Sequence, residues 1–344
     1  MIISVCGNGY SGSGAVFDLL RENNEIGVPQ YDIEFLFLYD VDGIDDLKYH
    51  IVDNPVRFFS SDAAIKRYKK YIDNICSPNS KINKLGGKEI RVATEKYLNN
   101  ITQIDWNGWW QFDVINSMPI KRNVEFRIKP RINKVLSRIG LQPMKILSNN
   151  RMFLSIRPEK FDLYTKQYVA ELVSMFNPQN RAHTLLNQPF PVGKHKKYRS
   201  YFSDKMKTIY VLRDPRDIYI ATKEAYKAYG SWIPQSNIDD YIQYYKLLYS
   251  IDYNAIDVDE EMVVHFEDLV LNYENTVDQI YHFLDITTQR NKQFFNPDIS
   301  KANVGLFYRY NQYDNDIKKI EKELYNALYN FTDSNLLKSG GRVF

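Results

Sequence analysis

The sequence predicts an α/β protein in which a central parallel sheet is flanked by helices. Two observations carry this prediction. Residues 1–20 read as a short apolar strand, a loop with four glycines and an amphipathic helix. From residue 207 onward, runs rich in β-branched residues alternate with helical patterns, which is typical of parallel sheets covered on both faces. A chain of 344 residues with 44% hydrophobic content has ample material for a buried core.

The first elements follow from local patterns. Ile2–Cys6 is an apolar run that ends at the glycines, and it predicts the first strand. A helix is expected over about 13–23, because its apolar residues recur at helical spacing. A second short strand is expected at 25–28, since Pro29 prevents its continuation.

The region 45–195 shows weaker patterns and reads as a mainly helical insertion. Helices are expected at 63–75 and 169–175. The stretch 121–131 alternates apolar and polar residues, which predicts an edge strand with one solvated face. Its five basic residues leave a second interpretation open, in which the stretch contacts an acidic polysaccharide.

Regular α/β alternation resumes after this region. The chain is expected to form strands at 208–212 and 262–266, and helices at about 218–229, 239–250 and 273–284. We therefore predict one domain, with a core of 1–40 and 205–310, an insertion of about 45–195 and a helical tail of 311–344. Ligands of open parallel sheets bind at the carboxyl ends of strands. The glycine loop and Arg213 both follow such ends.

The glycine loop has the layout of a phosphate cradle. Small residues let backbone N–H groups point at a ligand where a helix begins. The loop lacks the Gly-Lys-Ser/Thr of magnesium-assisted ATP chemistry, so we expect a phosphorylated ligand and no metal. The residues expected to hold this ligand are Gly9, Tyr10, Ser11, Gly12, Ser13, Gly14 and Ala15.

Composition excludes several classes of protein. A net charge of +3 does not suggest a nucleic-acid binder driven by bulk electrostatics. Two cysteines, Cys6 and Cys76, cannot form a disulfide framework, which fits a reducing compartment. The sequence has no apolar run of the ~20 residues that a transmembrane helix needs, and its first residues do not read as a signal peptide. We expect a cytoplasmic protein without a transmembrane segment.

Four separated segments resemble one family, the sulfotransferases that use 3′-phosphoadenosine-5′-phosphosulfate (PAPS). They are similar to the family's segments in order and spacing, and the resemblance covers 1–36 and 207–310. The family has a P-loop-like three-layer fold, with an insertion that selects the acceptor. The four segments are Gly9–Gly14, Tyr210–Asp217, Val264–Leu269 and Ser300–Gly305.

The resemblance implies a function and a set of site residues. PAPS would be the donor, held without a metal, and a hydroxyl of a saccharide or polysaccharide would be the acceptor. The glycine loop would hold the 5′-phosphosulfate. The residues implied for the 3′-phosphate and adenine are Arg213, Thr222, Lys301, Asn303 and Gly305.

A general base must remove the proton of the acceptor hydroxyl. The segment that begins at Asp32 resembles the one that carries a catalytic carboxylate in carbohydrate-type members. Asp32 is therefore our first candidate and Glu34 the second. The two are separated by one residue, so they share a face in an extended segment.

The chain departs from the family at two positions. Most members have a basic residue where Tyr10 stands, so Lys194 or Arg57 would have to supply that charge. The family also tends to have a serine where Ala221 stands, and Thr222 is the nearest substitute. These departures leave open a non-catalytic relative that binds PAPS or its product PAP. A kinase-like nucleotide-binding enzyme is the other alternative.

Overall fold

A computed structural model describes residues 1–57, 59–110, 118–146, 150–224, 231–249, 251–252, 255–287 and 293–331. The end of the helix expected at 218–229, and the tail beyond residue 331, lie outside the described residues.

A five-stranded parallel sheet forms the centre of the molecule, in the strand order β2-β5-β1-β6-β7. This arrangement confirms the predicted α/β class. The strand β1 pairs with β5 on one side and with β6 on the other, with Gly7 of β1 opposite Val211 of β6. The strands are β1 (Ile2–Gly7), β2 (Ile26–Gly27), β5 (His183–Asn187), β6 (Met206–Leu212) and β7 (Glu261–His265). The region predicted as an insertion thus supplies one strand of the main sheet, β5.

Both faces of the sheet are buried, because successive strand residues point to opposite sides. Ile3 and Val5 pack with α1 (Ser13–Leu20), α12 (Phe266–Leu271) and α13 (Tyr273–Leu284). Ile2 and Cys6 pack toward the other face with a helical layer. The helices of that layer are α2 (Ile44–Lys48), α3 (Ser60–Ile75), α4 (Lys81–Ile101), α8 (Phe161–Met175) and α9 (His195–Tyr198).

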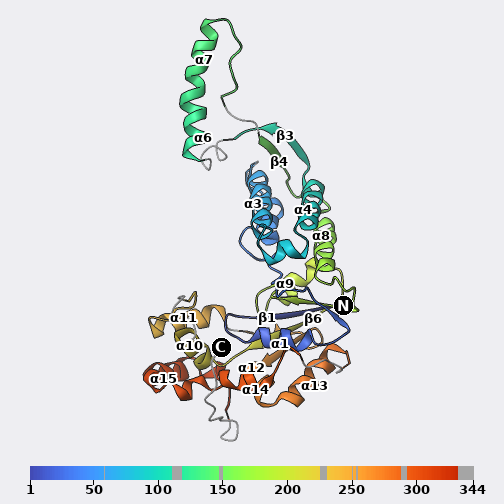
Figure 1. Cartoon of the computed structure of the whole chain (residues 1–344), viewed down its shortest axis with the longest axis vertical. Helices are drawn as coiled ribbons and strands as arrows, with labels where there is room; N and C mark the ends of the chain where they lie inside the picture. Colours follow the sequence, from blue (N-terminus) through green and yellow to red (C-terminus); the bar gives the residue numbers. More distant parts are fainter. Residues whose placement is uncertain are drawn as a thin grey trace.

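A third cluster of buried residues lies beyond the strand ends (Figure 1). It joins α10 (Pro215–Glu224), α11 (Ile238–Leu248) and α15 (Asp314–Glu323), with the short helix α14 (Pro297–Ser300) nearby. None of the described helices is both long and apolar enough to cross a bilayer.

An arm projects from the helical layer, away from the sheet (Figure 1). Its base is an antiparallel pair of strands, β3 (Ile104–Gly108) and β4 (Asn150–Leu154). Its tip contains α6 (Pro119–Asn123), a π-helical turn (Val124–Ile128) and α7 (Lys129–Arg138).

The edge strand predicted at 121–131 is therefore wrong. The alternation that suggested it covers a few residues only, and a longer view shows apolar residues at helical spacing through Ile139. No strand among the described residues lies beside this segment to pair with it. A helix satisfies its own backbone hydrogen bonds and is the stable alternative there.

Candidate functional site

A cavity of about 500 Å³ opens between the glycine loop and the ends of β6 and β7. Its volume is that of a small-molecule site. Its lining combines the loop, a single arginine and several aromatic rings. The lining residues are Tyr10, Ser11, Gly12, Ser13, Gly14, Ala15, Asp18, Arg213, Trp232, Phe266, Phe294, Phe295, Asn296, Ile299, Ser300 and Asn303.

The loop needs glycine where it meets the end of β7. Gly12 has a φ of +84°, in the left-handed region that favours glycine. A Cβ at this position would lie 2.5 Å from the ring of Phe266. The loop therefore packs directly on this ring, and α1 begins at the next residue.

Arg213 joins the glycine loop to a later segment of the chain. Its side chain is buried, with 3% of the residue exposed. Its Nη1 donates to the carbonyl of Tyr10 at 3.1 Å, and its Nη2 donates to the carbonyl of Asn303. The guanidinium lies 5.1 Å from the centre of the Phe266 ring. A permanent positive charge is thus fixed at the wall of the cavity.

The segment 300–305, which we call the late loop, is held by a buried carboxylate. Asp217 accepts hydrogen bonds from the N–H groups of Gly305 at 2.7 Å and Phe307 at 3.4 Å. Burial raises the pKa of Asp217 to about 6, although Arg213 and these N–H groups favour the charged form. Gly305 has a φ of +65°, which turns the chain back toward α10.

Some residues predicted for the donor site point elsewhere. Lys301 Nζ pairs with Asp298 at 2.6 Å, and Lys301 does not line the cavity. Thr222 is buried and donates from its hydroxyl to the carbonyl of Tyr219, within its own helix. Of the predicted late-loop residues, Asn303 lines the cavity, and Gly305 lies behind it against Asp217.

Tyr10 occupies the loop position where a basic residue was expected. Its backbone has a φ of 63°, and its ring stacks on Trp232 at 5.3 Å between centres. Lys194 and Arg57 do not line the cavity, so Arg213 is the only cation among its described lining residues.

A polar cluster follows the neighbouring strand β5. Gln188 accepts from the N–H of Gly7 at 3.0 Å and donates to Ser13 Oγ at 3.1 Å. Asn187 donates from its side chain to Asp32 Oδ1 at 3.1 Å. The end of β5 thereby connects the glycine loop to the candidate general base.

Asp32 and Glu34 do not line the cavity. Glu34 bridges to Asn187 through the backbone. The pKa of Glu34 is raised, first by loss of water around its carboxyl and then by Asp32 and Asp40. Asp18 does line the cavity, and its pKa is raised mainly by burial, with a smaller contribution from Asp32.

Two further acids are buried behind Arg213. Asp214 forms a bidentate pair with Arg216, with distances of 3.0 and 2.7 Å. Glu267 accepts the N–H of Asp214 at 2.9 Å. Burial raises the pKa of Glu267 to about 8, with smaller effects from Asp214 and Asp217.

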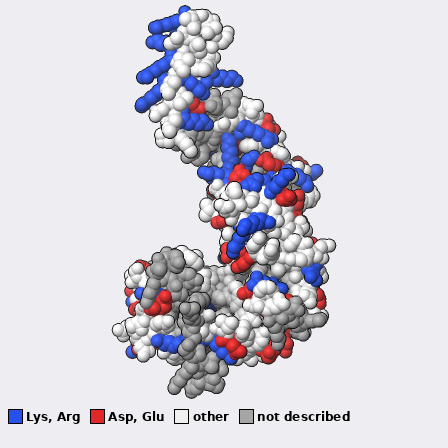
Figure 2. All heavy atoms as spheres, viewed as in Figure 1, with Lys and Arg blue, Asp and Glu red and all other residues white. Residues whose placement is uncertain are grey.

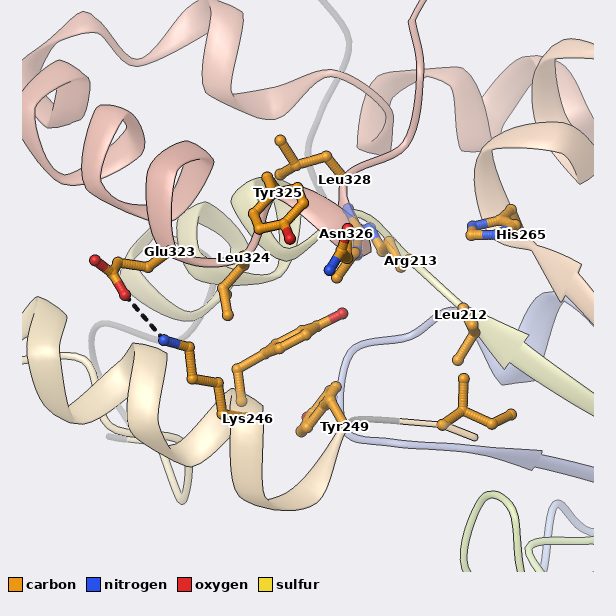
Figure 3. Close-up of a pocket in the computed structure, with 13 residues that line it drawn as sticks. Leu212, Arg213, Lys246, Tyr249, His265, Glu323, Leu324, Tyr325, Asn326 and Leu328 are labelled. Atoms are coloured by element: carbon orange, nitrogen blue, oxygen red, sulfur yellow. Dashed lines mark hydrogen bonds and ion pairs between the residues drawn. The ribbon is translucent and has the colours of Figure 1, made fainter. Parts of the chain in front are cut away.

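Arg213 also borders a second cavity, of about 540 Å³ (Figure 3). This cavity lies between α11 and the segment after α15, where Lys246 pairs with Glu323 at 2.9 Å. Tyr249 belongs to its wall and donates to the carbonyl of Gly9 at 2.7 Å. The guanidinium therefore stands between two hollows, one of which contains the glycine loop.

Sequence reasoning missed eight residues that line the first cavity, namely Asp18, Trp232, Phe266, Phe294, Phe295, Asn296, Ile299 and Ser300. Asp18 could have been found, since it lies four residues after Gly14 on the same helical face. Phe266 stands in one of the segments that resembles the family. Trp232 and Phe294 lie outside helices and strands. No local sequence pattern indicates that these segments fold back against the glycine loop.

Comparison with known proteins relates part of the chain to one family. A family model described as "Sulfotransferase family" matches residues 145–290, a span that includes three strands of the sheet, Arg213 and Phe266. No curated protein matches the chain.

Among solved structures, the chain is similar to "Sulfotransferase Domain from the Synechococcus PCC 7002 Olefin Synthase". The identity is 12%, the TM-score is 0.35, and the match covers 86% of this chain and 75% of that one. The family model covers less than half of the chain, so the comparison shows that residues 145–290 are similar to sulfotransferases.

Proposed function

We propose that this protein transfers a sulfuryl group from PAPS to a hydroxyl of a saccharide. The observation that carries the proposal is the buried guanidinium of Arg213, which lies against the glycine loop at the ends of two adjacent strands. A donor with phosphate groups on both sides of its ribose needs two anion sites side by side. A helix N-terminus and a planar arginine meet that need.

The cavity also suits the rest of the donor. Phe266 and Trp232 offer aromatic faces at its wall for an adenine ring. Asn303 and Ser300 bring polar groups of the late loop to the same space. When bound, PAPS supplies a sulfuryl group on a good leaving group, so the protein's work is mostly positioning and charge stabilisation.

The chain's own residues would divide this work. The first turn of α1 and Arg213 hold the two anionic ends. Gln188 fixes the loop through Gly7 and Ser13. Asp32 would accept the proton of the acceptor hydroxyl, with Glu34 as the alternative. Tyr10 would donate a neutral hydrogen bond to the group in transit, where most members of the family supply a charge.

The saccharide acceptor rests on the segment that begins at Asp32, which resembles the carbohydrate-type members. Asp32 lies close enough to Asp18, which lines the cavity, for their charges to interact, and this closeness supports Asp32 as the base that an acceptor would meet. Turnover of PAPS with a panel of saccharides and simple phenols tests this part. Turnover with phenols alone would contradict it.

Calorimetry with PAP tests the donor site. Arg213→Ala should weaken PAP binding by about 2–5 kcal/mol, because one anionic group loses a buried charged contact. Arg122→Ala, on the exposed arm, is the matched control and should leave the affinity unchanged. Equal affinity of wild type and Arg213→Ala for PAP, or tighter binding of magnesium ATP than of PAP, would contradict the proposal. PAP binding without any turnover would indicate a non-catalytic relative.

A further inference from the structure

The tip of the arm carries an apolar stripe that nothing in the described chain covers. Ile128, Ile132, Val135 and Ile139 follow each other at spacings of four, three and four residues, so they share one face of the helix. Their exposed fractions are 47, 41, 56 and 63%. A helix that packed in a protein core would bury such a stripe.

The same segment is strongly basic. Residues 118–146 hold eight lysines and arginines and one acid, Glu125, which is buried. The segment thus carries +7, while the whole chain carries +3, so the rest of the chain is net negative. Figure 2 shows most of these basic side chains projecting from one side of the tip. The bases are Lys121, Arg122, Arg127, Lys129, Arg131, Lys134, Arg138 and Lys145.

The arm's own return segment does not cover the stripe. It contacts a neighbouring face of α7, where Asn133 bonds to Met144 and Lys129 donates to the carbonyl of Ile146. At about 100° per residue, Arg131 and Arg138 border the stripe on its other side. The apolar face therefore has bases along its edges, and none of the described residues packs over it.

We propose that the arm tip docks on an anionic lipid bilayer. A basic helix with one apolar face and a strongly polar opposite face is typical of helices that lie in the membrane interface. The four stripe residues would enter the boundary between headgroups and acyl chains. Arg131 and Arg138 would extend their long side chains to the lipid phosphates.

The positive charge of the arm tip favours an anionic bilayer over a purely apolar partner. An apolar groove on another protein would need the stripe but not the bases. Eight bases against one buried acid on a single projecting tip call for a surface dense in negative charge. The proposal is independent of the sulfotransferase activity, because it involves no residue of the donor cavity.

Vesicle flotation of the full-length protein tests the proposal. The protein should float with phosphatidylcholine vesicles that contain about one third phosphatidylglycerol, and should stay behind with pure phosphatidylcholine. High salt should release it, since it screens the attraction. Failure to float with the anionic vesicles at low salt would overturn the proposal.

Paired variants separate charge from apolar contact. Arg131→Glu with Arg138→Glu should weaken partition at least 30-fold, from about 1 kcal/mol for each lost base. Lys70→Glu with Lys88→Glu makes the same charge change on exposed positions of α3 and α4, and should have a much smaller effect. Equal losses in both pairs would mean that only net charge matters, and would overturn a specific docking face.

The apolar stripe has its own control. Ile132→Asn with Val135→Asn should abolish flotation, while Val41→Asn with Val258→Asn, at residues 78% exposed elsewhere, should not. Sedimentation velocity without lipid serves as the second readout. A dimer that Ile132→Asn dissociates, together with no vesicle binding by wild type, would assign the stripe to a second copy of the chain instead.

Discussion

At the scale of single residues, Glu267 shows how the site region limits stability. Its carboxyl is fully buried, and its pKa is raised from 4.5 to about 8, mainly by burial. Between these values the folded protein keeps a proton that the unfolded chain has released. The free energy of unfolding must therefore fall as pH rises from 4.5 to 8, by at most about 1.4 kcal/mol per pH unit for this group.

Glu267→Gln should remove that dependence, because an amide keeps the neutral shape and can still accept the N–H of Asp214. Urea unfolding at pH 6, 7 and 8 measures it. We expect a flatter profile in the variant and greater stability than wild type at pH 8. Glu274→Gln, at an exposed position of α13, is the control. Parallel profiles for wild type and Glu267→Gln would show that Glu267 is not the group that titrates.

Tyr10 is the residue that the proposed function assigns to the group being transferred. Tyr10→Phe should lower kcat about 10–100-fold and leave PAP affinity unchanged, because the phenol would donate only to the group being transferred. Steady-state turnover and PAP calorimetry together check this. Tyr49→Phe, 48% exposed and remote, is the control. A parallel loss of PAP affinity would instead assign Tyr10 to ground-state binding.

At the scale of elements, the late loop depends on α10. Asp217 holds the N–H groups of Gly305 and Phe307, and so keeps Asn303 against Arg213. Asp217→Ala should weaken PAP binding at least 10-fold and speed proteolysis within 300–309. Glu267→Gln, a change in the same buried cluster that leaves these bonds intact, should do neither. Normal PAP affinity in a folded Asp217→Ala protein would separate the late loop from the donor site.

The elements also show which features local sequence can predict. The strands β1 and β6 were predictable, because a buried parallel strand is a short apolar run with its own boundaries. Arg213 lies against the glycine loop because the two strands that they follow, β6 and β1, are neighbours in the sheet. Thr222 was expected in the site as a neighbour of Ala221. Adjacent residues on a helix point about 100° apart, so Thr222 faces a different direction from Ala221. The hydroxyl of Thr222 donates to the carbonyl of Tyr219 in its own helix.

Other differences from the expectations depend on how the chain folds around a segment. The direction of Lys301 depends on Asp298, a partner only three residues away but fixed by how the late loop folds. The segment 121–131 was misread as a strand because a few alternating residues fit both the period of a strand and that of a helix. Whether a neighbouring strand is present decides between strand and helix, and the sequence of the segment itself does not contain that information.

At the scale of the whole molecule, the two proposals assign separate tasks to the arm and to the sheet core, and the stabilities of these two parts should be separable. The pair β3–β4 closes the base of the arm, with Gly108 opposite Asn150. The three buried clusters contain none of the residues that the structure describes between 109 and 149, which are 109–110 and 118–146. A two-residue Asn-Gly turn joins antiparallel strands in that register, so it can replace 109–149.

This shortened chain should fold and bind PAP with unchanged affinity, yet no longer float with anionic vesicles. Trp110 donates to the buried carboxylate of Asp62 at 2.8 Å, so the deletion should cost about 1–3 kcal/mol of unfolding free energy. Urea unfolding, PAP calorimetry and flotation measure the three properties on one protein. Loss of PAP binding in a folded variant would show that the arm reaches the donor site. Retained flotation would place the lipid-binding surface elsewhere on the molecule.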